Sequence, residues 1–135
     1  MPMQEEFTTA DSAMRILLVD DEPLLLKSFT RYLGSVCGHD VVCANGGGEA
    51  LAHLETGEVV DLILCDLTMP DIDGAEVHRA ICDNYPEWHG RFVFLTGGVI
   101  DEATDSYVQN SGVLVLSKPI RQVTFDKVLA DVSGV

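Results

Sequence analysis

The sequence predicts an α/β fold in which five β-α units build a parallel sheet with helices on both faces. Five short apolar runs recur along its 135 residues. Each run is nearly continuous rather than alternating, which is typical of a strand covered on both sides. A segment with helical spacing follows each run, and this alternation indicates right-handed crossovers between parallel strands. The expected strands are residues 16–19, 41–44, 62–65, 92–95 and 113–116.

The first helix is expected over about residues 23–36. Pro23 suits a first helical turn, where its missing amide hydrogen would have had no partner. An apolar stripe at helical spacing is formed by Leu25, Phe29, Leu33 and Val36. We expect this stripe to face the sheet.

Four further helices are expected over about residues 48–55, 74–84, 101–110 and 122–132. Pro86 follows the second of these four, where a proline marks a stop. The 101–110 segment is polar, whereas the other three carry apolar positions that should turn inward. These positions are Leu51 and Leu54, then Val77, Ala80 and Ile81, then Phe125, Val128, Leu129 and Val132.

Length and charge limit the class of protein. A chain of this size suits one core, which we place in residues 14–135. Residues 1–13 contain no Lys or Arg, so we expect a disordered lead-in or linker rather than a signal peptide. No apolar run approaches the roughly 18 residues that a membrane span needs. The net charge of −14, with no basic stripe, argues against nucleic acid and anionic membranes as partners.

The cysteines fit a reducing, cytoplasmic setting. Cys37, Cys43, Cys65 and Cys82 match no zinc spacing. Cys43 and Cys65 stand inside apolar runs, and we interpret them as small core residues. His78 and Cys82 lie four positions apart on an expected helix, but a single such pair is weak support for a metal site.

Polar residues stand where four of the five expected strands end. In an open α/β sheet, ligands bind beyond the carboxyl ends of the strands, near the point where the strand order reverses. In the flavodoxin-like order 2-1-3-4-5, strands one, three, four and five are neighbours, so these side chains would converge on one edge. They are Asp20 and Asp21 after the first strand, Asp66 after the third, Thr96 after the fourth and Lys118 after the fifth.

The charges of this group favour a bound cation. Three carboxylates and one ammonium sum to −2, and carboxylates held close together repel each other unless a cation intervenes. Oxygen ligands in a compact site favour Mg²⁺, which leaves room for a phosphate. Asp66, on the middle strand of the group, is then the expected nucleophile toward phosphorus, with Lys118 offsetting charge and Thr96 offering a hydroxyl. Each residue alone could equally be a helix cap, a turn or a surface residue.

These residues carry a resemblance to the response-regulator receiver domains of two-component signalling. The run Ile-Leu-Leu-Val-Asp-Asp-Glu-Pro at 16–23 resembles the start of such a domain, and Asp-Leu-Thr-Met-Pro-Asp-Ile-Asp-Gly at 66–74 resembles its phosphoacceptor segment. Phe-Leu-Thr-Gly at 94–97 and Lys118-Pro119 resemble its switch threonine and its lysine–proline pair. The resemblance spans about residues 14–132. Within the family, the sequence is similar to chemotaxis regulators and to receivers of hybrid sensor histidine kinases.

The resemblance implies a phosphorylation switch rather than an enzyme for an external substrate. Asp66 would accept a phosphoryl group from a histidine kinase or a histidine phosphotransfer protein, and the domain would assist its own phosphorylation and dephosphorylation. Asp21, Asp66 and the Thr68 backbone carbonyl would bind Mg²⁺, with Asp20 acting through metal-bound water.

The resemblance also implies how the switch would respond. Lys118 would pair with Asp66 and then with the phosphoryl group, and the Lys118–Pro119 peptide bond would be cis. Thr96 would move toward that group and shift the surface of the fourth helix, fifth strand and fifth helix, through which receivers can also form homodimers.

Three positions depart from the family pattern. Val115 stands where the family often has a Tyr or Phe coupled to the switch threonine, so the output surface should respond differently. Thr68 and Gly98 stand two residues after the acceptor and the switch threonine, where side chains tune the lifetime of the phosphoryl group. Gly98 has no side chain with which to shield that group.

Two rival functions remain open. A phosphatase of the haloacid dehalogenase type would carry Asp-x-Asp after its first strand, whereas Asp20 and Asp21 are adjacent. A constitutive interaction module would keep the fold without switching, which Val115 slightly favours. The glycine run at 45–49 lacks the Gly-Lys-Ser/Thr of a nucleotide loop and is interpreted as the turn into the second helix. Whether the receiver is free-standing or part of a hybrid kinase also stays open.

Overall fold

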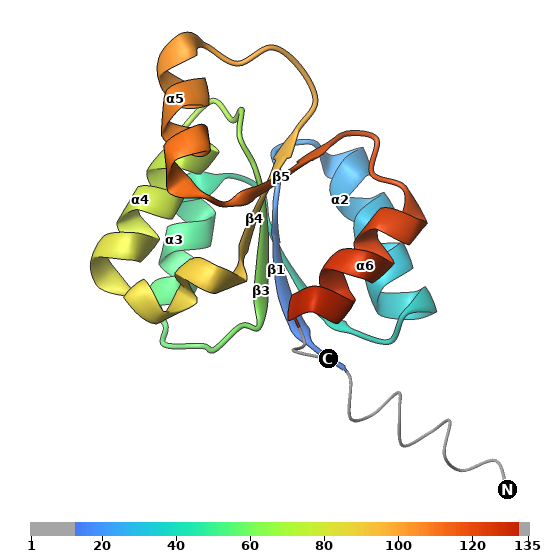
Figure 1. The fold of residues 1–135 in the computed structure, drawn as a ribbon. Coiled ribbons are helices and arrows are strands. Elements are labelled where there is room, and N and C mark those ends of the chain that lie inside the picture. The colour runs from blue at the N-terminus through green and yellow to red at the C-terminus, as the bar shows by residue number, and fades with distance from the viewer. Residues whose placement is uncertain (1–12, 133–135) are drawn as a thin grey trace, which may run out of the picture.

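The computed structural model describes residues 13–132, and it confirms the expected α/β fold (Figure 1). Parallel strands form one sheet of order β2-β1-β3-β4-β5. The strands are β1 (Arg15–Val19), β2 (Asp40–Ala44), β3 (Leu62–Asp66), β4 (Phe92–Thr96) and β5 (Leu114–Ser117). The lead-in expected at 1–13 lies outside the described residues, apart from Ala13, and stays a prediction.

Two groups of helices cover the two faces of the sheet. As Figure 1 shows, α2 (Pro23–Thr30) and α6 (Gln122–Val132) lie on one face, and α3 (Gly47–Glu55), α4 (Gly74–Asn84) and α5 (Glu102–Ser111) lie on the other. Because side chains alternate along a strand, Leu64 packs into the core on the α2 side and Cys65 into the core on the α4 side. This two-sided burial explains the continuous apolar sequence of the central strands. A 3₁₀ segment, η2 (Pro86–Arg91), joins α4 to β4.

The first helix changes geometry before it ends. After α2 the chain continues as a π-helical segment, η1 (Arg31–Val36), and the Cys37 amide donates to the Tyr32 carbonyl five residues back at 3.0 Å. Each residue of a π-helix turns less about the axis than a residue of an α-helix. Phe29 and Leu33 are buried as expected. The expectation that Val36 is buried is wrong, because the smaller turn per residue directs its side chain away from the sheet, and it is 68% exposed.

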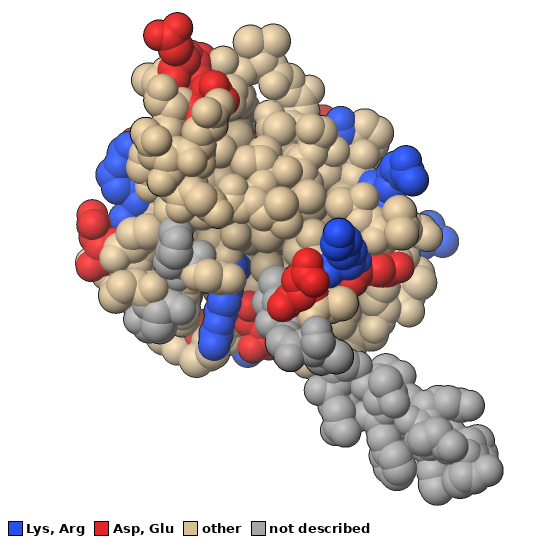
Figure 2. All heavy atoms as spheres, viewed as in Figure 1, with Lys and Arg blue, Asp and Glu red and all other residues tan. Residues whose placement is uncertain are grey.

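The outer strands are less covered than their apolar sequence predicts. Cys43 on β2 is exposed, so its interpretation as a core residue is wrong, whereas Cys65 on β3 is fully buried. On β5, Leu114 and Val115 are 49% and 36% exposed, which contradicts the expectation of a strand covered on both faces. The helices pack over the central strands and leave the outer ones partly bare, and Figure 2 shows an uncharged area over β5. The side chain of Val132, which was expected to turn inward, lies outside the described part of the structure.

The register of the sheet brings the ends of four strands to one edge. Asp20 directly follows β1, and Asp66 at the end of β3 pairs with Leu95 of β4. The Lys118 amide extends the ladder by donating to the Thr96 carbonyl at 2.7 Å. In the part of the chain that the structure describes, no helix has the length and apolar character to cross a membrane.

We expect Val115→Ala to change the free energy of unfolding by less than about 1 kcal/mol, because a partly exposed side chain loses little buried area. Val93→Ala, at a buried position of neighbouring β4, should cost about 2 kcal/mol through lost burial and a new cavity. Urea denaturation of both variants checks this. Equal costs at the two positions would contradict the exposure of β5.

Candidate functional site

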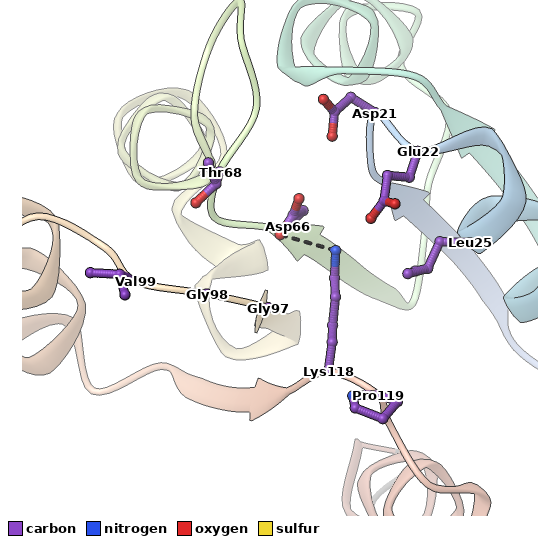
Figure 3. A pocket seen from close by; sticks show the side chains of 10 residues that line it. All are labelled: Asp21, Glu22, Leu25, Asp66, Thr68, Gly97, Gly98, Val99, Lys118 and Pro119. Carbon is purple, nitrogen blue, oxygen red and sulfur yellow. Dashed lines mark ion pairs between the residues drawn. The ribbon is translucent and has the colours of Figure 1, made fainter.

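The loops at this edge of the sheet surround a pocket of about 640 Å³ (Figure 3). Three of the sequence-predicted side chains, those of Asp21, Asp66 and Lys118, line it, and Asp20 lies buried beside them. The full lining consists of Asp21, Glu22, Leu25, Asp66, Thr68, Gly97, Gly98, Val99, Lys118 and Pro119. The strand ends of the sequence therefore do converge on one cavity.

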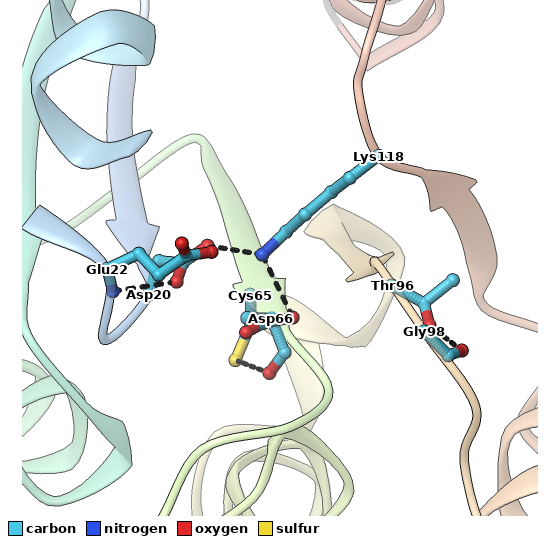
Figure 4. A network of polar contacts seen from close by, with 7 residues as sticks. All are labelled: Asp20, Glu22, Cys65, Asp66, Thr96, Gly98 and Lys118. Atoms are coloured by element: carbon cyan, nitrogen blue, oxygen red, sulfur yellow. Dashed lines mark hydrogen bonds and ion pairs between the residues drawn. The ribbon is translucent and has the colours of Figure 1, made fainter. Parts of the chain in front are cut away.

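Lys118 joins the two buried carboxylates of the site (Figure 4). Its Nζ atom lies 2.7 Å from Oδ2 of Asp20 and 3.3 Å from Oδ1 of Asp66. Asp20 has no exposed surface, and its other oxygen, Oδ1, accepts from the Glu22 amide at 3.0 Å. The closer partner of Lys118 is therefore Asp20, although the family resemblance emphasised Asp66.

Of the two buried carboxylates, that of Asp66 is the one whose charge is only partly compensated. Burial, reinforced by the nearby charge of Asp20, raises the pKa of Asp66 to about 6, although Lys118 and the donating Thr68 amide act in the opposite direction. For Lys118, burial lowers the pKa, but the hydrogen bond to Asp20 and the charge of Asp66 outweigh it, so the pKa is raised. The ammonium is therefore firmly protonated, while Asp66 lacks full compensation.

The donor set at the mouth of the pocket fits a hard divalent cation. One carboxylate oxygen from each of Asp20, Asp21 and Asp66 can be chosen so that all lie within 4.8 Å of one another. Asp20 already uses both oxygens, so the freer oxygens belong to exposed Asp21 and to Asp66. Thr68 lines the same pocket. Oxygen-only donors with space for water are the ligands that Mg²⁺ prefers.

Thr96 is the predicted site residue whose side chain does not join the group. It ends β4, but its hydroxyl donates to the Gly98 carbonyl at 3.4 Å rather than pointing toward Asp66, as Figure 4 shows. The expectation that all five polar side chains converge is therefore wrong for Thr96 in this arrangement. Gly97 and Gly98, which follow it, line the pocket.

Local backbone features hold the acceptor strand and its neighbour in place. The Lys118–Pro119 peptide bond is cis, as the resemblance implied. Gly74 begins α4 directly against the acceptor strand, where an added Cβ would lie 2.4 Å from the Asp66 carbonyl oxygen. Only a glycine permits this close approach.

Three lining residues were missed from the sequence. Glu22, Leu25 and Val99 line the pocket, but none of them ends a strand. Glu22 could have been found because it directly follows the two aspartates of the β1 end. Leu25 and Val99 carry no chemical signal and enter the pocket only through the loop geometry.

The fold and this acidic edge define the class of CheY-like domains. A CheY-like response regulator receiver domain protein from Methanospirillum hungatei superposes with a TM-score of 0.78, at 27% identity, over 90% of this chain and 95% of that one. Vibrio cholerae chemotaxis protein CheY4 superposes with a TM-score of 0.75, at 25% identity, over 89% of this chain and 98% of that one.

The model of the response regulator receiver domain family matches residues 16–130, so this chain belongs to that family. It is a receiver domain of two-component signalling, and a phosphoacceptor role is consistent with that membership.

Curated relatives include both kinases and regulators. The CAI-1 autoinducer sensor kinase/phosphatase CqsS of Vibrio cholerae is 35% identical over 118 residues, which cover 86% of this chain. The positive alginate biosynthesis regulatory protein of Pseudomonas aeruginosa is 34% identical over 110 residues, or 80% of this chain. This chain spans only 17% and 42% of the length of those two proteins.

Asp66→Asn should stabilise the metal-free protein at pH 7 by about 2 kcal/mol, after allowing for solvent screening. An aspartate with a raised pKa binds its proton more tightly in the folded state, so wild-type stability falls as the pH rises from about 4 through about 6. Asparagine carries no such cost, and the advantage should vanish near pH 4. Urea denaturation in EDTA across this range tests it; an advantage independent of pH would contradict the assignment.

Proposed function

We propose that Asp66 accepts a phosphoryl group from the phosphohistidine of a histidine kinase or a histidine phosphotransfer protein. The observation that carries this proposal is the position of the Asp66 carboxylate, on the floor of an open pocket with its charge only partly compensated by Lys118. In the transfer, an Asp66 oxygen forms a bond to phosphorus while the bond from phosphorus to the histidine nitrogen breaks. Hydrolysis of the aspartyl phosphate by water would return the domain to its starting state.

The proposed metal ligands are Asp21, Asp66 and the backbone carbonyl of Thr68, with Asp20 acting through metal-bound water. The engagement of both Asp20 oxygens by Lys118 and by the Glu22 amide supports this division of roles. Bound Mg²⁺ would supply positive charge next to the incoming phosphoryl oxygens, where positioning and neutralisation dominate the chemistry.

Lys118 has a second proposed role once the phosphoryl group is attached. Its ammonium lies within reach of Asp66 and can donate to a phosphoryl oxygen, because an ammonium has three hydrogens and Asp20 uses one of them. The Lys118 side chain would then hold Asp20 and the phosphoryl group together on one side of the pocket.

The proposed switch is a rotation of the Thr96 hydroxyl from the Gly98 carbonyl to the phosphoryl group. The present hydrogen bond is long, 3.4 Å, so little energy opposes the exchange. Movement of the loop after β4 would displace α5, which begins five residues beyond Gly97, and so change the surface of α5, β5 and α6. Val115 cannot act as a rotating aromatic reporter, so the shift of α5 itself carries the signal.

We further propose that this exchange takes place in the cytoplasm, where the four cysteine thiols of the chain would stay reduced. The kinases among the relatives support a histidine kinase as phosphodonor. The relatives are compatible with both a free-standing regulator and a receiver segment of a larger kinase.

Incubation with acetyl phosphate and Mg²⁺ should add one phosphoryl group to the wild-type protein, as measured by intact mass. Asp66→Asn and wild type in EDTA should both gain none, because the first lacks the nucleophile and the second lacks the cation. Asp61→Asn, at the opposite end of the sheet, is the matched control and should be labelled like wild type. Labelling of Asp66→Asn would move the acceptor elsewhere.

Absence of labelling in the wild type would direct the test to a panel of phosphohistidine donor proteins. A chain that no donor labels, yet that binds its partner constitutively, would be a non-switching interaction module. Turnover of an external phosphomonoester would instead indicate a phosphatase.

Lys118→Ala should uncouple phosphorylation from the response of the output surface. NMR spectra of the wild type should show shifts in α5, β5 and α6 on phosphorylation, whereas the variant should keep the unphosphorylated positions even where Asp66 is labelled. Lys127→Ala, an exposed lysine of α6, is the control and should respond like wild type. Identical shifts in Lys118→Ala and wild type would refute the coupling role.

A further inference from the structure

One helix at the functional edge obtains its N-terminal cap from another part of the chain. Asp73 caps α4 through the Glu76 amide, and Asp101 caps α5 through the Thr104 amide. The N-cap residue of α3 is Gly46, which has no side chain to supply. The first amides of α3 would therefore lack a side-chain acceptor if the helix had to cap itself.

The missing acceptor comes from Asp71, in the loop that follows the phosphoacceptor strand. Its Oδ1 accepts from the Gly47 amide at 3.3 Å, and its Oδ2 accepts from the Gly48 amide at 3.0 Å. The hydrogen bond from the Gly48 amide, followed by those from the Ile72 and Gly47 amides, lowers the pKa of Asp71, so the carboxylate is charged at neutral pH. A negative charge at this place is also favoured by the helix dipole.

The glycine run after β2 makes the space for this carboxylate. A Cβ at Gly46 would lie 3.0 Å from an Asp71 oxygen, and one at Gly48 would lie 3.1 Å from the other. At Gly47, a Cβ would lie 2.4 Å from the Ile72 carbonyl oxygen. The run is therefore more than a flexible turn, because each of its three glycines admits a part of the 71–72 segment.

The same loop carries the groups proposed to meet the metal and the acceptor. The Thr68 amide donates to the Asp66 carboxylate, and Thr68 precedes Asp71 by three residues. At its end the loop is closed by the Gly74 amide, which donates to the Leu67 carbonyl at 3.0 Å. Between these anchors, the contact of Asp71 with α3 restrains the segment that presents the Thr68 backbone.

We propose that Asp71 is a positioning residue, which holds the loop of Thr68 in its metal-binding shape by fastening it to the N-terminus of α3. This inference rests on the proposed Mg²⁺ site, and Asp71 itself lines no part of the pocket. Its effect should be on metal affinity rather than on the chemistry of transfer, since the ligands remain present but are less well organised. Loss of such outer partners typically costs about tenfold in metal affinity.

The first test uses metal-free protein and NMR hydrogen exchange. Asp71→Ala should reduce the protection of the Gly47 and Gly48 amides and shift the Thr68 amide resonance. The control Asp61→Ala removes a carboxylate that accepts from the Arg15 amide at 2.8 Å, at the other end of the sheet, and should leave Thr68 unchanged. An unmoved Thr68 resonance in Asp71→Ala would overturn the proposal whether or not the protein binds metal.

The second test is a Mg²⁺ titration of the same resonances. Asp71→Ala should weaken binding about tenfold, and Asp71→Asn should lie between it and wild type, because one amide oxygen replaces two carboxylate oxygens. Phosphorylation by acetyl phosphate should need correspondingly more Mg²⁺ but approach the wild-type rate at saturation. Wild-type affinity in Asp71→Ala would overturn the proposal, as would equal losses in Asp71→Ala and Asp71→Asn, which would indicate charge alone.

A double variant separates positioning from stability. In Asp71→Ala/Gly46→Asn the three atoms nearest to a Gly46 Cβ, all from the Asp71 carboxylate, are gone, so an asparagine can cap α3 locally and restore the thermal stability. The loop stays detached, and Mg²⁺ binding should stay weak. Recovery of metal affinity together with stability would show a merely structural role. Absence of Mg²⁺ binding in wild type would instead refute the proposed function, while the exchange experiment would still decide the role of Asp71.

Discussion

Lys118 places one ammonium between two carboxylates that the sheet would otherwise force together. Asp20 is fully buried and lies 2.7 Å from the ammonium, so its charge is compensated in place. An unpaired charge at that depth would be strongly destabilising. Asp66 receives the more distant contact, 3.3 Å, and keeps a pKa of about 6 because burial and the charge of Asp20 are only partly offset. The site therefore retains an uncompensated negative charge next to an open pocket, which is the property that a cation and a phosphoryl acceptor both require.

The loop after β3 shows how the fold keeps that acceptor accessible without leaving it loose. At one end, α4 begins at Gly74, so close to the Asp66 backbone that no side chain fits. In the middle, Asp71 bonds to the first turn of α3, a helix whose own cap position is a glycine. Both anchors are polar or close-packed backbone contacts, and neither occupies the pocket. Thr68, which precedes both anchors in the loop, can then present its backbone to the site while its side chain remains exposed.

Much of the fold and of the site could be predicted from the sequence, because the relevant signals are local. Continuous apolar runs marked the strands, and helical spacing marked the segments between them. Since parallel strands end at the same edge, the residues directly after the strands could be placed together before any distance was known. This reasoning correctly brought Asp21, Asp66 and Lys118 to one pocket and placed Asp20 beside them. The strand order needed only the rules for crossovers and the family resemblance.

What the sequence by itself determined, then, is the identity of the elements and the edge at which its charged residues meet. Only the tertiary structure decided that Lys118 lies closer to Asp20 than to Asp66, that the Thr96 hydroxyl bonds to the Gly98 carbonyl, and that β5 is partly bare. The contact of Asp71 with the first turn of α3 could not be predicted either, because Asp71 and Gly48 are 23 residues apart and neither residue is unusual alone. The physical reason is common to all of these: periodicity reports which face of an element is apolar, whereas contacts between side chains depend on distances across the fold and on rotamers that neighbouring elements select.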